Sequence, residues 1–150
     1  PYTTLFRSGH THYSANAGLI ELRKEIADYL KRNFCVSYNP EDQIIVTVGG
    51  SEAIDIALRG LVGPGDEVII PEPSFVAYKG CTAFAGATPK VVNLRAEDNF
   101  KLTPKLLENA ITPKTKVLIF PFPNNPTGAI MTKDGIKAIV DVLKYHSFIR

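Results

Sequence analysis

Three short stretches of the sequence carry residues that could bind a ligand. The first, Gly-Gly-Ser at positions 49–51, follows one apolar run and precedes another. The glycines permit close backbone approach or a positive φ, and Ser51 can cap a helix. The free amides at such a helix start would suit an anion such as a phosphate. Taken alone, a tight turn with a helix cap is the plainer interpretation, because the GxGxxG and Walker nucleotide patterns are both absent.

The other two stretches are PEPSF at positions 71–75 and PFPNNPTG at positions 121–128. Three prolines, two asparagines and a Thr-Gly pair predict a rigid turn for the latter. Asn125 offers both a donor and an acceptor, which suits a polar ring substituent or a carboxylate. The plainer alternative is a connector in which Asn124 and Asn125 bond only to their own backbone.

The elements that must position these stretches alternate along the chain. Short β-branched runs predict strands over 43–50, 67–73, 88–94 and 115–122. Helical spacing predicts helices over 19–33, 51–62, 74–86, 103–111 and 132–144, the second apolar almost all round and therefore buried. The alternation predicts an α/β fold, a three-layer sandwich around a mostly parallel sheet. Ligands bind beyond the carboxyl ends of the strands of such sheets, where all three stretches fall.

Composition narrows the class of protein. The 150 residues are 45% hydrophobic with a net charge of +2, which is typical of a globular domain and gives no support for a nucleic-acid partner. No apolar stretch approaches the roughly 20 residues that span a bilayer, so no membrane partner is expected. Cys35 and Cys81 are isolated, which favours reduced thiols in a cytoplasmic protein over a single disulfide. The histidines do not cluster, and no metal site is expected.

Four motifs occur in an order that points to one family: HYSANAGLIELRKEI, GGSEA, GDEVIIPEPSFVAY and NNPTG. Together they resemble the class I/II aminotransferases of fold type I, which use pyridoxal 5′-phosphate (PLP). The resemblance runs from about His10 to Leu143. It implies the large domain of the PLP-dependent transferase fold. It also implies a homodimeric enzyme that moves an amino group from an amino acid to a 2-oxo acid.

The resemblance assigns roles to particular positions. Gly50 and Ser51 match the residues that bind the cofactor phosphate. Phe75 matches the aromatic residue that stacks on the pyridine ring. Asn125 matches the asparagine that contacts the phenolic oxygen of the cofactor and the substrate carboxylate. Tyr13 matches the tyrosine that reaches the cofactor phosphate of the partner subunit.

Other residues that the family uses are expected beyond Arg150. They are the Schiff-base lysine in a serine–lysine motif, the aspartate of an Asp-x-x-Tyr motif, and the arginine that binds the substrate carboxylate. Lys79, Lys133 and Lys144 occupy none of these contexts. No catalytic residue is therefore assigned, and the chain is expected to be a truncated, inactive part of the large domain.

The expected domain organisation combines this family resemblance with a separate interpretation of the first eight residues. Residues 1–8 resemble translated sequencing-adaptor sequence and are interpreted as a non-native leader. Residues 9–33 form an N-terminal segment and helix, and 34–150 form a partial PLP-binding domain. Two alternatives keep the fold: another PLP enzyme such as a carbon–sulfur lyase or a synthase, and the sensor domain of a transcription regulator. A phosphate-binding domain without PLP would make the four ordered motifs a coincidence.

Overall fold

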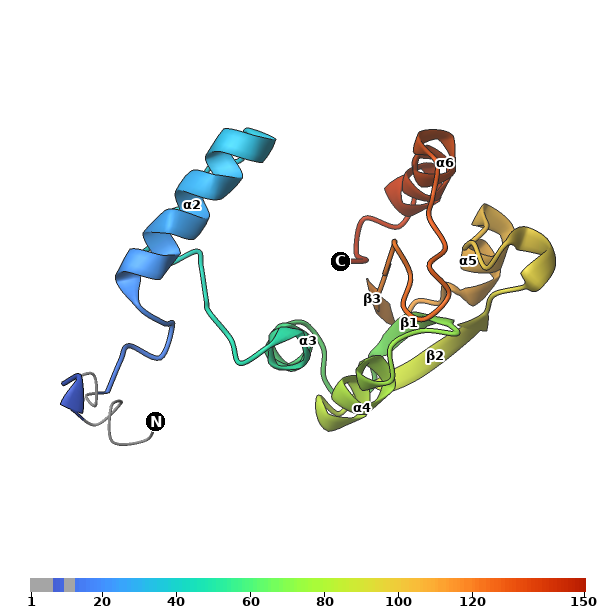
Figure 1. Ribbon diagram of the computed structural model, residues 1–150. Helices are drawn as coiled ribbons and strands as arrows, with labels where there is room; N and C mark the ends of the chain where they lie inside the picture. The colour runs from blue at the N-terminus through green and yellow to red at the C-terminus, as the bar shows by residue number, and fades with distance from the viewer. Residues whose placement is uncertain (1–6, 10–12) are drawn as a thin grey trace. The chain divides into compact units, whose positions relative to one another are not determined.

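The computed structural model describes residues 7–9 and 13–150 of the chain. Most of the predicted leader, residues 1–6, lies outside the described residues, so that interpretation stays a prediction. The chain divides into two compact units, residues 1–50 and 51–150 (Figure 1). Each unit is described by itself.

Unit 1 is built around helix α2, Ile20–Phe34, which confirms the helix predicted over 19–33. Arg23 is buried, and its Nη1 donates to the carbonyls of Pro40 and Glu41 at 2.8 and 3.0 Å. These bonds attach the following loop to the helix. Ala27 is also buried, whereas three apolar residues of the predicted inner face are exposed: Leu19, Leu22 and Tyr29.

The predicted strand over 43–50 is wrong. Ile44 is buried, but the side chains of Ile45 and Val48 are 59% and 91% exposed. The backbone here bonds to a loop, with the amide of Val46 donating to the carbonyl of Ala17 at 3.0 Å. A β-branched run favours extended backbone, but a strand forms only beside a hydrogen-bonded neighbour, and this segment pairs with no described strand.

Unit 2 contains a three-stranded parallel sheet among the residues described. Its strands lie in the order β2-β1-β3, so β1 is central. Their bounds are Glu67–Glu72 for β1, Thr88–Asn93 for β2 and Thr115–Leu118 for β3. At the outer edge of β3, the Arg150 amide donates to the Lys116 carbonyl, and the Leu118 amide donates to the Arg150 carbonyl. This is the bonding pattern of a parallel neighbour.

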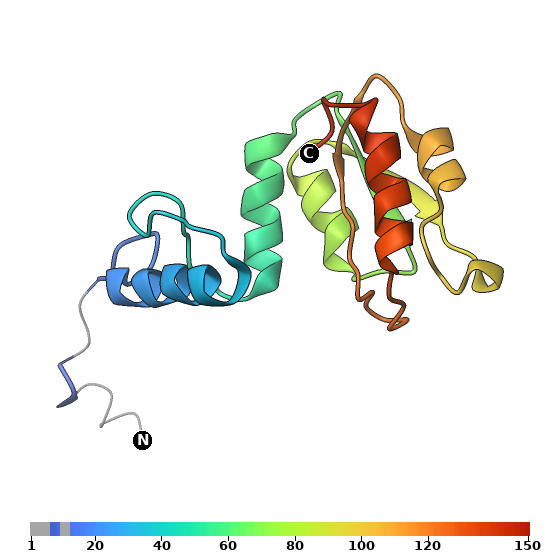
Figure 2. The same ribbon diagram turned by 90° about the horizontal axis from the view of Figure 1, so that it is seen from above.

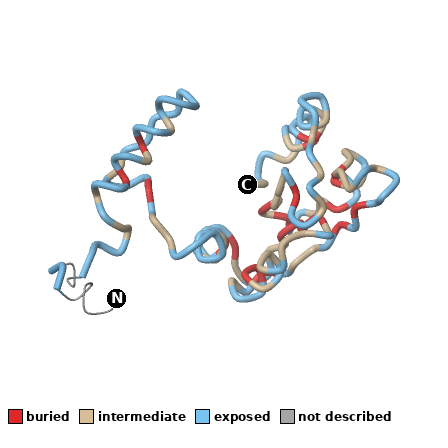
Figure 3. The backbone as a smooth tube through the Cα atoms, in the orientation of Figure 1, coloured by how far each residue is buried: buried red, intermediate tan, exposed pale blue. Residues whose placement is uncertain are grey.

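Helices cover both faces of this sheet (Figure 2). Val68 and Ile70 of β1 face one side, where they pack with α3, Gly50–Leu61, and α4, Ala77–Phe84. Ile69 faces the other side, where α5, Pro104–Ala110, and α6, Lys133–Lys144, complete the core. Burial is strongest along the central strand β1, where residues 68–71 are buried, whereas only Val92 of β2 is buried (Figure 3). The predicted three-layer α/β sandwich with a parallel sheet is confirmed.

Three predicted elements differ in detail. Helix α4 begins at Ala77 rather than at residue 74, because the prolines at 71 and 73 leave the next residues in a loop. Strand β3 ends at Leu118 instead of continuing to residue 122. Helix α3 is buried only along one side: Leu58 is 3% exposed, whereas Ile56 and Leu61 are 41% and 49% exposed.

Both cysteines are free thiols, Cys35 exposed and Cys81 buried. Within residues 7–9 and 13–150, no helix is both long and apolar enough to cross a membrane.

Candidate functional site

The start of helix α3 has the form of an anion site. Gly49 has φ +81°, which favours glycine, and Gly50 opens the helix. Ser51 therefore lies inside the first turn, and its predicted role as the helix cap is wrong. Gly50 and Ser51 are exposed, and a Cβ added at Gly50 would meet no atom within 4 Å. The amides of a first helical turn have no intrahelical partner, so this open space suits a phosphate.

The loop between β1 and α4 holds Phe75. Its ring is half-buried and meets the ring of Tyr78 edge to face, with centroids 5.8 Å apart and planes at 81°. The amide of Tyr78 donates to the carbonyl of Phe75 at 3.2 Å. The carbonyl of Tyr78 in turn accepts from the Thr82 hydroxyl at 2.8 Å. Tyr78, to which the sequence assigned no role, therefore packs its ring against the ring of Phe75.

The loop between β3 and α6 holds Asn125, whose side chain is exposed, beside Asn124, which is 4% exposed. Asn124 Nδ2 donates to the carbonyl of Pro73 at 2.8 Å and to Thr127 Oγ1 at 3.0 Å. The interpretation that both asparagines serve only their own backbone is therefore wrong for Asn124. Its side chain joins this loop to the one that carries Phe75.

Ser51, Phe75 and Asn125 belong to unit 2, whereas Gly49 and Gly50 belong to unit 1. Phe75 and Asn125 follow the carboxyl ends of β1 and β3, which are neighbours in the sheet. The start of α3 lies beside α4, since Cys81 Sγ is 4.0 Å from the carbonyl of Ser51. Tyr13 is fully exposed and belongs to unit 1, so its role stays a prediction.

Charged groups near the Phe75 loop are paired. Lys79 Nζ lies 2.7 Å from Glu72 Oε1 at the end of β1, and this ion pair is partly exposed. The sequence analysis assigned no role to Glu72. The signal that could have indicated this ion pair is Lys79, which lies one helical turn beyond Phe75. Lys144, at the end of helix α6, is also paired: its Nζ lies 2.8 Å from Asp141 Oδ1.

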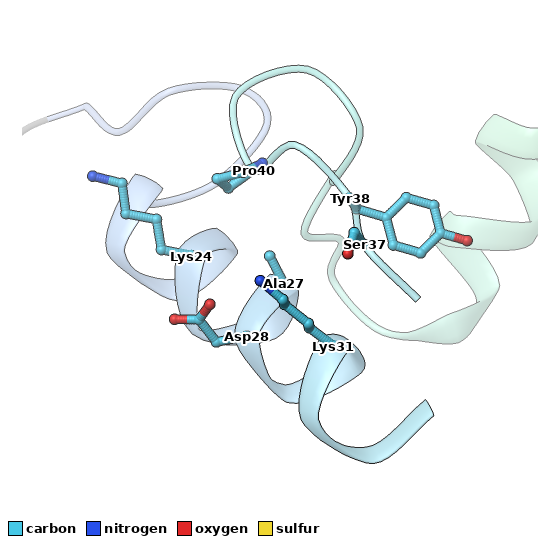
Figure 4. Close-up of a pocket in the computed structure, with 7 residues that line it drawn as sticks. All are labelled: Lys24, Ala27, Asp28, Lys31, Ser37, Tyr38 and Pro40. Atoms are coloured by element: carbon cyan, nitrogen blue, oxygen red, sulfur yellow. The ribbon is translucent and has the colours of Figure 1, made fainter. Parts of the chain in front are cut away.

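Unit 1 has a separate surface pocket between α2 and the loop that follows it (Figure 4). Its lining combines two lysines with an aspartate and a tyrosine, and none of these side chains belongs to the predicted site. The full lining is Lys24, Ala27, Asp28, Lys31, Ser37, Tyr38 and Pro40.

Comparison with known proteins identifies the family. The profile of the family described as aminotransferase class I and II matches residues 6–149. The Bacillus subtilis protein YugH, which carries a provisional aminotransferase name, is 48% identical over 94% of this chain and 36% of its own length. The aspartate/prephenate aminotransferase of Cereibacter sphaeroides is 43% identical over 93% of this chain and 34% of its own length.

Solved structures show the same fold. The aromatic aminotransferase from Pyrococcus horikoshii matches 98% of this chain with a TM-score of 0.88 and 37% identity, over 39% of its own length. The aspartate aminotransferase from Thermus thermophilus with maleate matches 97% with a TM-score of 0.85. The chain thus spans somewhat more than a third of the length of these proteins. It belongs to the class I and II aminotransferase family.

Proposed function

We propose that this chain supplies the cofactor-binding part of a longer, PLP-dependent aminotransferase, which transfers an amino group from an amino acid to a 2-oxo acid. The observation that carries the proposal is the joined pair of loops. Asn124 links the Asn125 loop to the Phe75 loop through Pro73, so an amide and an aromatic ring stand at neighbouring strand ends. The relatives whose names state an activity are aminotransferases for different substrates, so the donor and acceptor are left open.

Each predicted residue has a physical task in this proposal. The first turn of α3, with Gly50 and Ser51, binds the phosphate through backbone amides and the helix dipole. Phe75 stacks on the pyridine ring, and the ring of Tyr78 packs edge to face against it. Asn125 donates its amide hydrogens to the phenolic oxygen of the cofactor or to the substrate carboxylate.

When bound, PLP supplies the electron sink that makes amino-group transfer possible. The residues of this chain hold and orient that group. The resemblance implies two further groups downstream, a lysine that would form the Schiff base and an aspartate that would pair with the pyridinium nitrogen. A cytoplasmic homodimer, in which Tyr13 reaches the partner's phosphate site, is part of the proposal. By itself the chain is expected to be inactive.

The test begins with the gene on both sides of this segment. We expect an Asp-x-x-Tyr motif and then a serine–lysine motif in frame downstream. The full-length protein is then purified with PLP and assayed with amino acids and 2-oxo acids. Replacing Asn125 with Ala should lower kcat/KM about 10- to 100-fold, the loss expected for a hydrogen bond to a charged group. The matched control is Asn109→Ala on α5, an exposed asparagine that should leave kcat/KM unchanged.

Other outcomes would assign the alternatives. Release of ammonia and a 2-oxo acid without any acceptor would indicate lyase chemistry on the same cofactor. Bound PLP without turnover, together with an upstream DNA-binding domain, would indicate a sensor. An in-frame stop without the lysine motif, and no amino-group transfer, would overturn the proposal.

A further inference from the structure

We propose that Asn124 is a positioning residue that holds the Phe75 loop and the Asn125 loop together as one site. The proposal rests on the proposed function for its catalytic consequence, but the coupling between the loops is a property of the chain itself. Asn124 is 4% exposed although it lies in a loop whose neighbours, Pro123 and Asn125, are exposed. A buried amide in such a loop has lost its water and needs protein partners.

The hydrogen bonds of Asn124 act in two directions. Its backbone closes the loop, with the Gly128 amide donating to its carbonyl at 2.7 Å and its own amide donating to the Ala129 carbonyl at 2.9 Å. Its side chain reaches outside the loop, where Nδ2 donates to the Pro73 carbonyl at 2.8 Å. Pro73 lies two residues before Phe75, and Asn124 lies immediately before Asn125. One side chain therefore fixes the spacing of the two predicted cofactor contacts.

The chemistry of the partners requires an amide at this position. The carbonyl of Pro73 can only accept a hydrogen bond, and Thr127 Oγ1 also accepts from Nδ2. The nitrogen must therefore face these two oxygens, which leaves Oδ1 buried and without a hydrogen-bond partner within the described part of the chain. Aspartate has nearly the same shape but no donor, and it would bring a buried charge against the Pro73 carbonyl.

The first experiment measures amide hydrogen exchange in the full-length protein without PLP. Asn124→Ala should raise exchange about tenfold or more in residues 74–78, across the loop contact, because the Pro73 carbonyl has lost the hydrogen bond from Asn124 that attaches this loop. Asn124→Asp should do the same despite its shape. Thr127→Ala removes the two hydrogen bonds to Thr127 Oγ1, from Asn124 Nδ2 and from the Ala129 amide, but leaves the Pro73 contact, so its effect should be confined to residues 124–129.

Several results would overturn the proposal. In the Asn124→Ala variant, a rise in amide exchange that is confined to residues 124–129 would show that Asn124 stabilises only its own loop. A uniform rise, including strand β2, would show general destabilisation instead of coupling. Asn109→Ala should leave both loops unchanged.

The second experiment measures the consequence for the site. Asn124→Ala should weaken PLP binding about tenfold, as measured by fluorescence titration of the apoprotein with PLP. The kcat of this variant should also be reduced, even at saturating PLP and substrate. Full recovery of kcat at saturating PLP would overturn the positioning role. If the wild-type protein binds no PLP, the proposed function fails, while hydrogen exchange still decides whether Asn124 couples the loops.

Discussion

At the scale of single residues, Asn124 and Tyr78 make contacts that involve the two loops with the predicted cofactor contacts, Asn125 and Phe75. Asn125 and Phe75 stand out because their flanking prolines and glycines are local signals. The role of Asn124 depends on Pro73, which lies 51 positions away, and no local pattern indicates that bond. Tyr78 is a similar case, since a tyrosine three positions after Phe75 becomes meaningful only when both rings are placed in space.

Glu67 shows how one carboxylate can make the stability of unit 2 depend on pH. The hydrogen bond from the Thr112 hydroxyl, at 2.6 Å, lowers the pKa of Glu67 below its ordinary value of 4.5, and Lys90 adds to this effect. A lowered pKa in the folded state stabilises the protein at pH above the unfolded value. That contribution is lost as the pH falls through the folded pKa.

Replacing Thr112 with Val should therefore lower the free energy of unfolding by about 1 kcal/mol at pH 7. The difference in free energy of unfolding between the wild-type protein and the variant should become smaller below roughly pH 4.5. A protonated Glu67 is no longer stabilised by the charge-assisted hydrogen bond from Thr112. Urea denaturation of the 150-residue chain at low concentration, from pH 7 to 3, would measure it. Lys90→Gln should lower the free energy of unfolding by less, since Lys90 Nζ and Glu67 Oε2 are 3.5 Å apart and this ion pair is partly exposed. A difference independent of pH would contradict the assignment.

At the scale of elements, the spacing of apolar residues predicted the bounds of an element well wherever those bounds depend only on the residues of the element itself. Helix α2 and strands β1 and β2 lie close to their predicted bounds because their apolar spacing and their glycine and proline boundaries are local. The segment 43–50 failed because a strand is defined by its neighbour, and its apolar residues 45 and 48 are exposed. The early end of β3 likewise depends on pairing that the sequence does not display.

At the start of helix α3, alanine substitutions at two adjacent glycines, Gly49 and Gly50, should change the free energy of unfolding in opposite directions. Gly49→Ala should lower the free energy of unfolding by about 1 kcal/mol or more, because φ +81° disfavours a side chain. Gly50→Ala should be neutral or stabilising by up to about 1 kcal/mol, since its Cβ meets no atom within 4 Å and alanine favours a helix.

The Gly50 variant should nevertheless bind PLP more weakly in the full-length protein, because its methyl group occupies the space above the first turn. Urea midpoints and PLP titration measure the two effects separately. Tighter or unchanged PLP binding by Gly50→Ala would contradict the phosphate site at this helix start.

At the scale of the whole molecule, the two units differ in how much core each contains. The buried hydrophobic residues described in unit 1 are Ala27 and Ile44, whereas β1 of unit 2 holds Val68, Ile69 and Ile70 at 0% exposure. Full burial of one such aliphatic side chain stabilises a fold by about 1.5–3 kcal/mol. Stability should therefore be unevenly distributed, with unit 2 the more cooperative part of the chain.

Hydrogen exchange of the 150-residue chain tests this difference. Peptides covering α2, residues 20–34, should exchange at least about 100-fold faster than those covering β1, residues 67–72, because helix α2 can open without disrupting the sheet core. Removing residues 1–50 should leave the protection of β1 unchanged, which serves as the control. Equal protection of α2 and β1, lost together in one transition, would instead mean that the chain folds as a single cooperative body whose stability does not follow its two contact-defined units.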